Sequence, residues 1–219
     1  MKLSFALILL CLSVQTAIAQ KDKEEGRFTA SVIAGVSFSQ IDGDDDASYS
    51  KVGLNVGARG GVRFGDKMEL CTEILFAQKG SAINDRGIIF HLDYLEVPLL
   101  FYYKDWETID KNNRKFMRVM IGAGLSYSRL VNAATFRNNQ WETPENTPNF
   151  QDPFEKNDFM FMFDANFFFT KNFGMNLRWA RSILSIIDQD STLRSNPNPN
   201  NPKPKAFSHS VILRVFYKF

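Results

Sequence analysis

The sequence alternates between two kinds of side chain at every second residue, and it does so in eight separate segments. In residues 28–38 the even positions carry Phe, Ala and Val, whereas most odd positions carry Thr, Ser or Gly. A period of two is typical of a β-strand whose two faces meet different surroundings. The same alternation predicts further strands over residues 52–64, 68–78, 89–103, 117–128, 159–169, 175–182 and 210–219.

The composition of the two faces indicates which of them points inward. One face is rich in Gly, Ser and Asn and carries charges of both signs, while the other is large, apolar and dominated by Phe. Small residues fit a narrow interior, and a barrel of eight strands has an interior just wide enough to be filled by side chains. The apolar face is therefore expected to face lipid. We predict an all-β fold, an eight-stranded antiparallel up-and-down transmembrane β-barrel.

The connections between the predicted strands differ in length from one end of the barrel to the other. Membrane barrels have short periplasmic turns and longer outer loops, so both chain termini are expected in the periplasm. The short turns lie at 65–67 and 171–173, and the connection at 104–114 is longer than a periplasmic turn needs to be. The longer outer connections are expected at 40–51, 79–88, 129–157 and 186–206.

The first 19 residues have the features of a secretory signal peptide. A basic start at Lys2 is followed by an apolar run over residues 3–12, and Ala17 and Ala19 stand in the small-residue pattern of a cleavage site. The apolar run is shorter than the roughly 20 residues that a membrane-spanning helix needs. We therefore expect residues 20–219 to form one exported barrel domain.

Export to the outer membrane implies certain partners and argues against others. After removal of the signal peptide the chain keeps a single cysteine, Cys71, so no internal disulfide can form. The net charge of +2 gives no indication of nucleic-acid binding. The expected surroundings are outer-membrane lipids and lipopolysaccharide.

The last strand ends on an aromatic residue at the very C-terminus. Apolar or aromatic side chains occupy alternate positions before it, and this arrangement resembles the signal by which insertion machinery recognises outer-membrane barrels. An ordinary last strand that ends on Phe is the alternative. The predicted insertion signal comprises Val211, Leu213, Val215, Tyr217 and Phe219.

Three stretches carry a family resemblance. They are HLDYLEVPLLFYYK (91–104), ELCTEILFAQKGS (69–81) and IGAGLSYS (121–128). Together they resemble the PorT-like outer-membrane β-barrel family, also labelled the porin family or outer membrane protein beta-barrel domain, over nearly all of the mature chain. The resemblance implies an eight-stranded barrel, and the founding members are implied in a secretion system linked to gliding. So narrow a barrel does not imply a porin in the literal sense.

Charged residues recur on the polar face and are expected to fill the lumen. If the turn at 65–67 centres on Asp66, Arg59 lies opposite Glu73 and Arg63 opposite Glu69. We favour a plug of compensating charges over an ion-selective constriction, because the lumen is too narrow for solutes. The predicted lumen charge network comprises Arg59, Arg63, Glu69, Glu73, Glu96, Arg118, Asp164, Arg178 and Arg214.

An acidic segment, two histidines and one cysteine are the remaining candidates for metal binding or catalysis. The acidic segment 42–46 has calcium-binding character, but Ala47 and Gly53 stand where an EF-hand requires Gly and Glu, so a solvated loop is preferred. The two histidines, His91 and His209, lie near Asp93 and Ser210, but no nucleophile stands in a recognisable motif. Cys71 is expected to be inert. We therefore predict no catalytic residue, metal or cofactor.

The aromatic residues of the strand ends are expected to pack or to form the girdles of the membrane interface. These are Trp106, Trp179, Tyr102, Tyr103, Tyr127 and Tyr217.

The preferred function is a non-catalytic membrane scaffold whose outer loops, above all 129–157 and 186–206, meet a surface ligand or a protein partner. Four alternatives stay open from the sequence. They are a component of a secretion machinery, a lipid-modifying enzyme that uses His91 or His209 at the rim, a narrow channel, and a periplasmic lipid carrier of lipocalin shape. The last of these requires the Phe-rich face to point inward.

Overall fold

The structure is a computed structural model that describes residues 26–42, 49, 51–83, 87–109, 113, 115–137, 139–143, 154–187 and 206–219. The predicted signal peptide lies outside the described residues and stays a prediction. The acidic segment 42–46, expected to be a solvated loop, also lies outside them except for Asp42. The strands are β1 (Phe28–Ile41), β2 (Lys51–Phe64), β3 (Met68–Ile83), β4 (Ile88–Ile109), β5 (Lys115–Arg137), β6 (Gln140–Glu142), β7 (Asn157–Phe168), β8 (Phe173–Ser182) and β9 (Ser208–Lys218).

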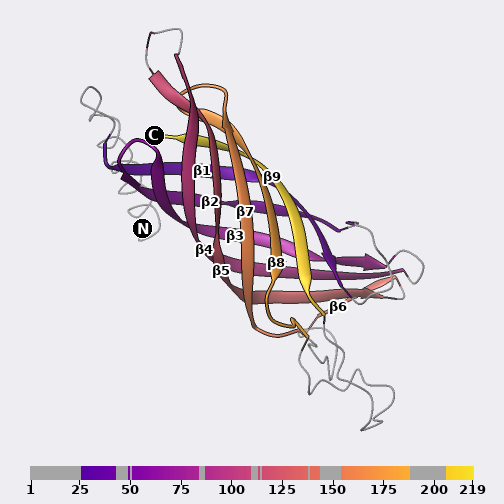
Figure 1. Cartoon of the computed structure of the whole chain (residues 1–219). Helices are drawn as coiled ribbons and strands as arrows, with labels where there is room; N and C mark the ends of the chain where they lie inside the picture. The colour runs from indigo at the N-terminus through magenta and orange to yellow at the C-terminus, as the bar shows by residue number, and fades with distance from the viewer. Residues whose placement is uncertain are drawn as a thin grey trace, which may run out of the picture.

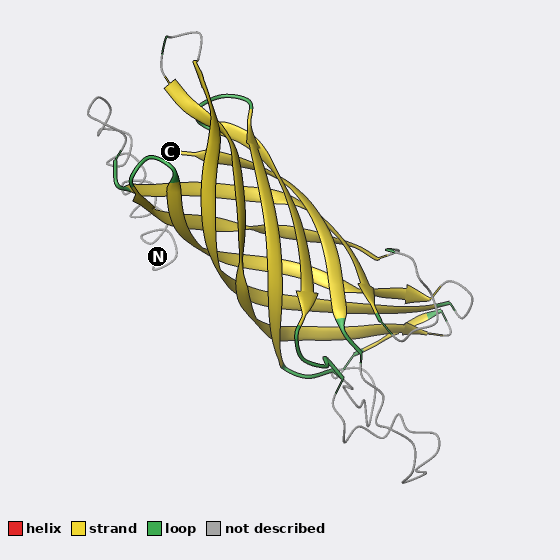
Figure 2. Cartoon of the chain, in the orientation of Figure 1, coloured by secondary structure: helices red, strands yellow, loops and turns green. Residues whose placement is uncertain are grey.

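Eight of these strands close into a barrel (Figure 1). Each pairs antiparallel with its neighbours in the chain, β9 returns to pair with β1, and β4 pairs with β5 to complete the ring. The short strand β6 pairs with β5 alone and stands outside the ring. The prediction of an eight-stranded antiparallel up-and-down barrel is confirmed, and Figure 2 shows strands throughout its wall.

The apolar face of the strands points outward. Leu125 on β5 and Phe163 on β7 are 57% and 52% exposed, whereas the intervening residues are buried along β7 and mostly buried along β5. This orientation contradicts the lipid-carrier alternative, in which the Phe-rich face would line the interior. Further exposed apolar residues of the outer wall are Val32, Leu54, Ile74, Leu99, Phe101, Ile121, Leu177, Leu213 and Val215.

The two ends of the barrel differ as the connection lengths predict. The turns at 65–67 and 169–172 lie at the end where β1 begins and β9 finishes (Figure 1). Short turns are a feature of the periplasmic end, so the long connections after β5 and β8 lie at the outer end. Among the described residues there is no helix with the length and apolar character needed to cross a membrane.

Strands β4 and β5 are longer than predicted. The expected connection at 104–114 is mostly strand, because β4 runs to Ile109 and β5 begins at Lys115. The alternation is interrupted at Trp106, whose φ is 61°, yet the register on the far side is unchanged and continues to Ile109↔Lys115. The expected connection at 79–88 is also shorter, because β3 runs to Ile83. With 22 and 23 residues, both strands exceed the roughly 9–11 residues that span a bilayer.

Apolar side chains occupy the lumen at both ends of the barrel. Towards the periplasmic end Ile33, Phe116, Met120, Phe168 and Phe216 belong to one buried cluster, and the rings of Phe168 and Phe216 pack edge to face. A second cluster fills the outer end and comprises Ile41, Leu92, Tyr94, Leu130, Ala133, Phe154, Ile186 and Ala206. The buried charged residues Glu73, Asp164 and Arg178 lie between these two apolar regions.

Candidate functional site

Three arginines and two carboxylates meet in the middle of the lumen. They are Arg59 on β2, Glu73 on β3, Asp164 on β7, Arg178 on β8 and Arg214 on β9, and we name them the central charge cluster. Each residue stands at an inward position of its strand and is at most 5% exposed. Alternation therefore brings to one level five residues that lie far apart in the sequence.

Glu73 is the hub of the central charge cluster. Its carboxylate accepts from Arg59 Nε at 2.7 Å, from Arg178 Nη2 at 3.0 Å and from Arg214 Nη1 at 3.2 Å. Arg178 Nη1 lies at 3.0 Å from the second carboxylate oxygen. The three guanidinium groups compensate the charge of this buried carboxylate and replace the water that it loses.

Asp164 is the second acceptor. It takes hydrogen bonds from Arg178 Nε and from the Tyr102 hydroxyl, both at 2.5 Å, and from Asn176 Nδ2 at 3.0 Å. Of the two roles expected for Tyr102, packing and an interface girdle, the structure shows packing, because the side chain is fully buried in the lumen. Arg59 also lies over its ring, at 5.3 Å.

Asparagine amides accept further hydrogen bonds from two of the three arginines. Arg214 donates to Asn176 Oδ1 at 2.8 Å and to Asn55 Oδ1 at 3.2 Å. Arg59 donates to Asn166 Oδ1 at 3.0 Å. A neutral amide can accept from a guanidinium without adding negative charge, which suits a cluster with one more arginine than carboxylate.

Two lysines that the sequence analysis missed extend the polar lumen. Lys79 on β3 pairs with Glu96 on β4 at 2.6 Å, and Lys104 on β4 pairs with Glu69 on β3 at 2.5 Å. Thr29 also donates to Glu69, at 2.5 Å. The connection predicted at 79–88 contains Lys79, and the predicted fourth strand ends at residue 103, one residue before Lys104. Continuing the alternation past those limits would have placed both lysines inward.

The predicted network of nine residues does not form one continuous unit. Five of them make the central charge cluster, and Glu96 stands at its edge, 3.9 Å from Arg178. Arg63 lies opposite Glu69 in the β2–β3 register but lines the periplasmic mouth. Arg118 also lies near that end, with its guanidinium over the rings of Trp106 and Phe167.

The predicted C-terminal insertion signal lies on the outer wall. Leu213, Val215, Tyr217 and Phe219 are exposed, and Val211 is half-buried on the same face. The rings of Tyr217 and Phe219 are 5.6 Å apart. The other predicted girdle residues, Trp106, Tyr103, Tyr127 and Trp179, are exposed or half-buried.

The two histidines lie near the outer end, each beside an acid. His209 Nε2 is 2.8 Å from Asp42, and its Nδ1 is 2.9 Å from the Tyr49 hydroxyl. His91 Nε2 is 3.0 Å from Asp93. Ser210 is fully buried and faces the lumen, so it points away from the neighbouring His209. Cys71 is buried too, and within the described ranges no group of three His, Cys, Asp or Glu residues could hold a metal ion.

The feet of the two longest outer connections are joined above the lumen. Phe154 and Ile187 form an isolated antiparallel bridge, and Glu155 N–H donates to Ile186 O at 2.7 Å. Ile186 N–H donates in turn to Ala206 O at 2.9 Å. Phe154, Ile186 and Ala206 are buried in the outer apolar cluster, and we name these three residues the outer cap. The cap packs in the outer apolar cluster and ties the described ends of both connections to the barrel.

Comparison with known proteins agrees with this fold. The model of a family described as outer membrane protein beta-barrel domain matches residues 18–188. Ail of Yersinia pestis is similar in structure, with a TM-score of 0.50, 12% identity, and coverage of 89% of this chain and all of Ail. OprG of Pseudomonas aeruginosa has a TM-score of 0.40, 13% identity, and coverage of 90% of this chain and 97% of OprG.

Neisserial surface protein A has a TM-score of 0.43 and 12% identity, with coverage of 90% of this chain and all of that protein. At these identities the likeness extends to the fold alone. No curated protein sequence matches the chain at a significant level.

Proposed function

The chain belongs to the outer membrane protein beta-barrel domain family and lies in the outer membrane, and on that premise we propose that it is a non-catalytic scaffold whose outer connections bind a surface ligand or protein partner. The closed lumen is the observation that carries this proposal. Glu73, Asp164 and three arginines fill its middle, and the apolar cluster that includes the outer cap fills its outer end. Because these side chains leave solutes no path along the lumen, we assign binding to the ends of the barrel.

The outer connections support the proposal by their length and anchoring. The chain between β5 and β7 and the chain between β8 and β9 are the longest between neighbouring strands of the ring. Binding residues are commonly carried on loops that a rigid scaffold positions. The outer cap provides such a base for both connections.

Protease treatment of intact cells tests the proposed topology. A protease site placed at residues 195–200 should be cleaved on intact cells, and the same site placed in the turn at 65–67 should be cleaved only after the outer membrane is permeabilised. The reverse pattern would overturn the orientation.

Replacement of an outer connection tests the proposed binding. The chain from 190 to 203 is exchanged for a short Gly-Ser linker, and adhesion of expressing cells is compared on immobilised glycan and protein surfaces. We expect adhesion to fall to the level of cells without the barrel while the amount of folded barrel stays unchanged. Equal adhesion of both strains to every surface would contradict the proposal.

Association with a secretion machinery is a second candidate function. Its support is the resemblance of the DYLEVPLL stretch (93–100) to PorT-like proteins, together with a β4–β5 hairpin that extends past the barrel at the periplasmic end. Cross-linking in cells followed by purification in detergent tests it. A stoichiometric set of periplasmic proteins is expected, and purification of the barrel alone would exclude this candidate.

A further inference from the structure

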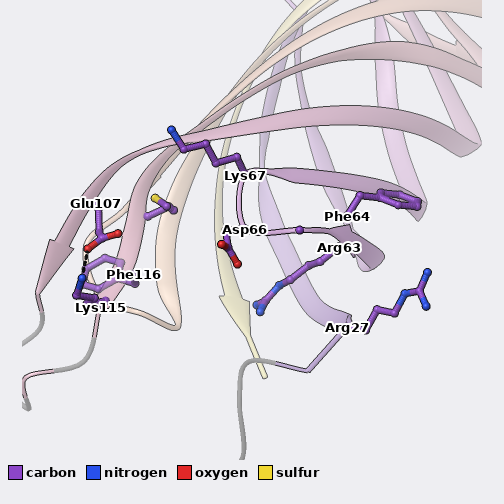
Figure 3. A pocket seen from close by; sticks show the side chains of 10 residues that line it. Arg27, Arg63, Phe64, Asp66, Lys67, Glu107, Lys115 and Phe116 are labelled. Atoms are coloured by element: carbon purple, nitrogen blue, oxygen red, sulfur yellow. Dashed lines mark ion pairs between the residues drawn. The ribbon is translucent and has the colours of Figure 1, made fainter.

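The periplasmic end carries an open cleft of about 1100 Å³. Its walls come from the chain before β1, the β2–β3 turn and the β4–β5 hairpin (Figure 3). In this view the hairpin stands on one side, the turn lies in the middle and Arg27 lies on the other side. We name this space the periplasmic cleft. Its lining residues include Arg27, Arg63, Asp66, Lys67, Glu107 and Lys115.

The β4–β5 hairpin projects past the neighbouring strands at the periplasmic end (Figure 1), and Glu107, Lys115 and Phe116 of this hairpin line the cleft. Pairing of β4 with β3 ends at Tyr103↔Met68, and Lys104 N–H then donates to Lys67 O at 2.7 Å. Pairing of β4 with β5 continues to Ile109. In the described pairings, residues 105–109 therefore have a strand neighbour on one side only. Such an edge offers backbone donors and acceptors to an incoming strand.

A strand added to this edge would run into the cleft. It would lie in line with β3, on the periplasmic side of Met68, where β3 begins. This position is next to the turn that carries Asp66 and Lys67. The cleft volume is at the upper limit of small-molecule pockets, which are usually about 300–1,000 Å³. The volume of the periplasmic cleft and the backbone edge of β4 at residues 105–109 together suit an extended peptide.

The charge of the cleft indicates the chemistry of that peptide. Four cationic side chains and two carboxylates line it, which is a formal excess of two positive charges. Glu107 is paired with Lys115 at 2.7 Å, and this hydrogen bond raises the pKa of Lys115. Asp66 is therefore the remaining carboxylate among Arg27, Arg63 and Lys67. An acidic ligand is complementary to this wall.

Trp106 gives an independent indication of a binding surface on the same hairpin. It is 58% exposed, and its φ of 61° lies in the left-handed region that non-glycine residues seldom adopt. Backbone strain of this kind is found preferentially at binding and active sites. The Arg118 guanidinium lies over its ring, at 5.6 Å from the ring centroid. Ile109, at the end of the same strand, is also exposed.

We propose that the periplasmic cleft binds an extended acidic segment of a periplasmic protein, which adds as a strand to the free edge of β4 and places its carboxylates against Arg27, Arg63 and Lys67. A lipid headgroup would match the charge but would leave the backbone edge unpaired. This site is separate from the outer connections, so replacement of residues 190–203 leaves it intact.

Peptide binding to the mature barrel in nanodiscs of zwitterionic lipid tests the proposal. The probe is a fluorescein-labelled decapeptide of alternating Glu and Val, and fluorescence anisotropy gives its Kd. Two matched probes carry Lys in place of Glu, or N-methyl groups on alternate amides. We expect each to bind at least tenfold more weakly than the acidic probe. Equal binding of the N-methylated probe would overturn strand addition.

Charge reversal locates the site. The double variant Arg27→Glu/Lys67→Glu should bind the acidic probe at least tenfold more weakly and gain affinity for the Lys-containing probe. Lys67→Glu alone, in an exposed turn, should show a smaller loss and covers the case in which the double variant does not fold. Arg129→Glu, at an exposed position near the outer end, is the matched control and should bind as the wild type does. Unchanged binding by both Lys67 variants would overturn the proposal.

Competition separates a peptide site from a phosphate site. Glycerol phosphate in solution and phosphatidylglycerol in the nanodisc are added against the acidic probe at constant ionic strength. Little displacement is expected from either. Full displacement by glycerol phosphate would assign the cleft to a phosphate ligand, and displacement only by the lipid would assign it to the membrane; both results contradict the proposal.

Discussion

Arg178 on β8 and Glu73 on β3 stand on opposite walls of the barrel, and their charged groups meet at 3.0 Å across the lumen. Four steps around the ring separate the two strands in either direction. The same holds for Arg59 on β2 and Asp164 on β7, whose charged groups approach to 3.6 Å. Contacts of this kind tie the strands across the barrel axis and not only along their hydrogen-bonded edges. The lumen is therefore a polar core that stabilises the closed ring.

Glu73→Ala should destabilise the barrel by about 3–5 kcal/mol, because it leaves buried guanidinium groups without their main carboxylate. Urea unfolding in detergent micelles measures the loss, and the temperature at which the band shifts on a gel should fall. The matched control is Glu107→Ala, at an exposed ion pair with Lys115, which should unfold like the wild type. Unchanged heat-modifiability of the Glu73 variant would count against a structural role for the cluster.

Leu125→Arg tests which face meets lipid. Leu125 stands midway along β5 on the outer wall, and an arginine at the bilayer midplane costs about 2–4 kcal/mol. Val131→Arg is the matched control, because Val131 lies on the same strand and face but six residues closer to the outer end. There the cost should fall to about 0–1 kcal/mol. Refolding into vesicles measures both, and equal costs at the two positions would refute a membrane band centred on Leu125.

The protein should not conduct ions as a pore. Purified wild-type barrel in a planar bilayer is expected to give no stable unit conductance, because paired charges and apolar side chains fill the lumen. An open porin measured in the same bilayer is the positive control. Reproducible steps of one size, abolished by heat denaturation of the barrel, would restore the channel alternative.

Alternation along single strands was enough to predict the wall and the pairing of neighbouring strands. The short turn at 65–67 determines the β2–β3 register, so Arg59 opposite Glu73 could be predicted. Partners across the lumen, such as Asp164 for Arg59, depend on the stagger of all eight strands as the ring closes. That stagger is not a local property of any segment, and no pattern within one strand reports it.

The ends of the strands were the second feature that the alternation did not predict correctly. Lys104 was missed because the fourth strand was ended one residue too early, and the interruption at Trp106 concealed the remainder of the hairpin. The alternation places Tyr102 on the inward face, but it does not predict the hydrogen bond from its hydroxyl to Asp164 across the lumen. The periplasmic cleft follows from the length of this hairpin, so it could not be predicted once the strand had been cut short.

Loss of the C-terminal aromatic should impair assembly more than it impairs the folded barrel. Phe219 is 51% exposed at the end of the outer wall, so its removal takes away no lumen contact. We expect deletion of Phe219 to lower the amount of heat-modifiable barrel in outer-membrane fractions severalfold, while refolding of the purified variant into detergent is little changed. The matched control is Phe173→Ala, at an exposed aromatic that pairs with Tyr217 at the same rim, and its level in the membrane should stay near that of the wild type. If both variants reach the outer membrane equally well, the terminal phenylalanine is an ordinary interface residue and not part of an insertion signal.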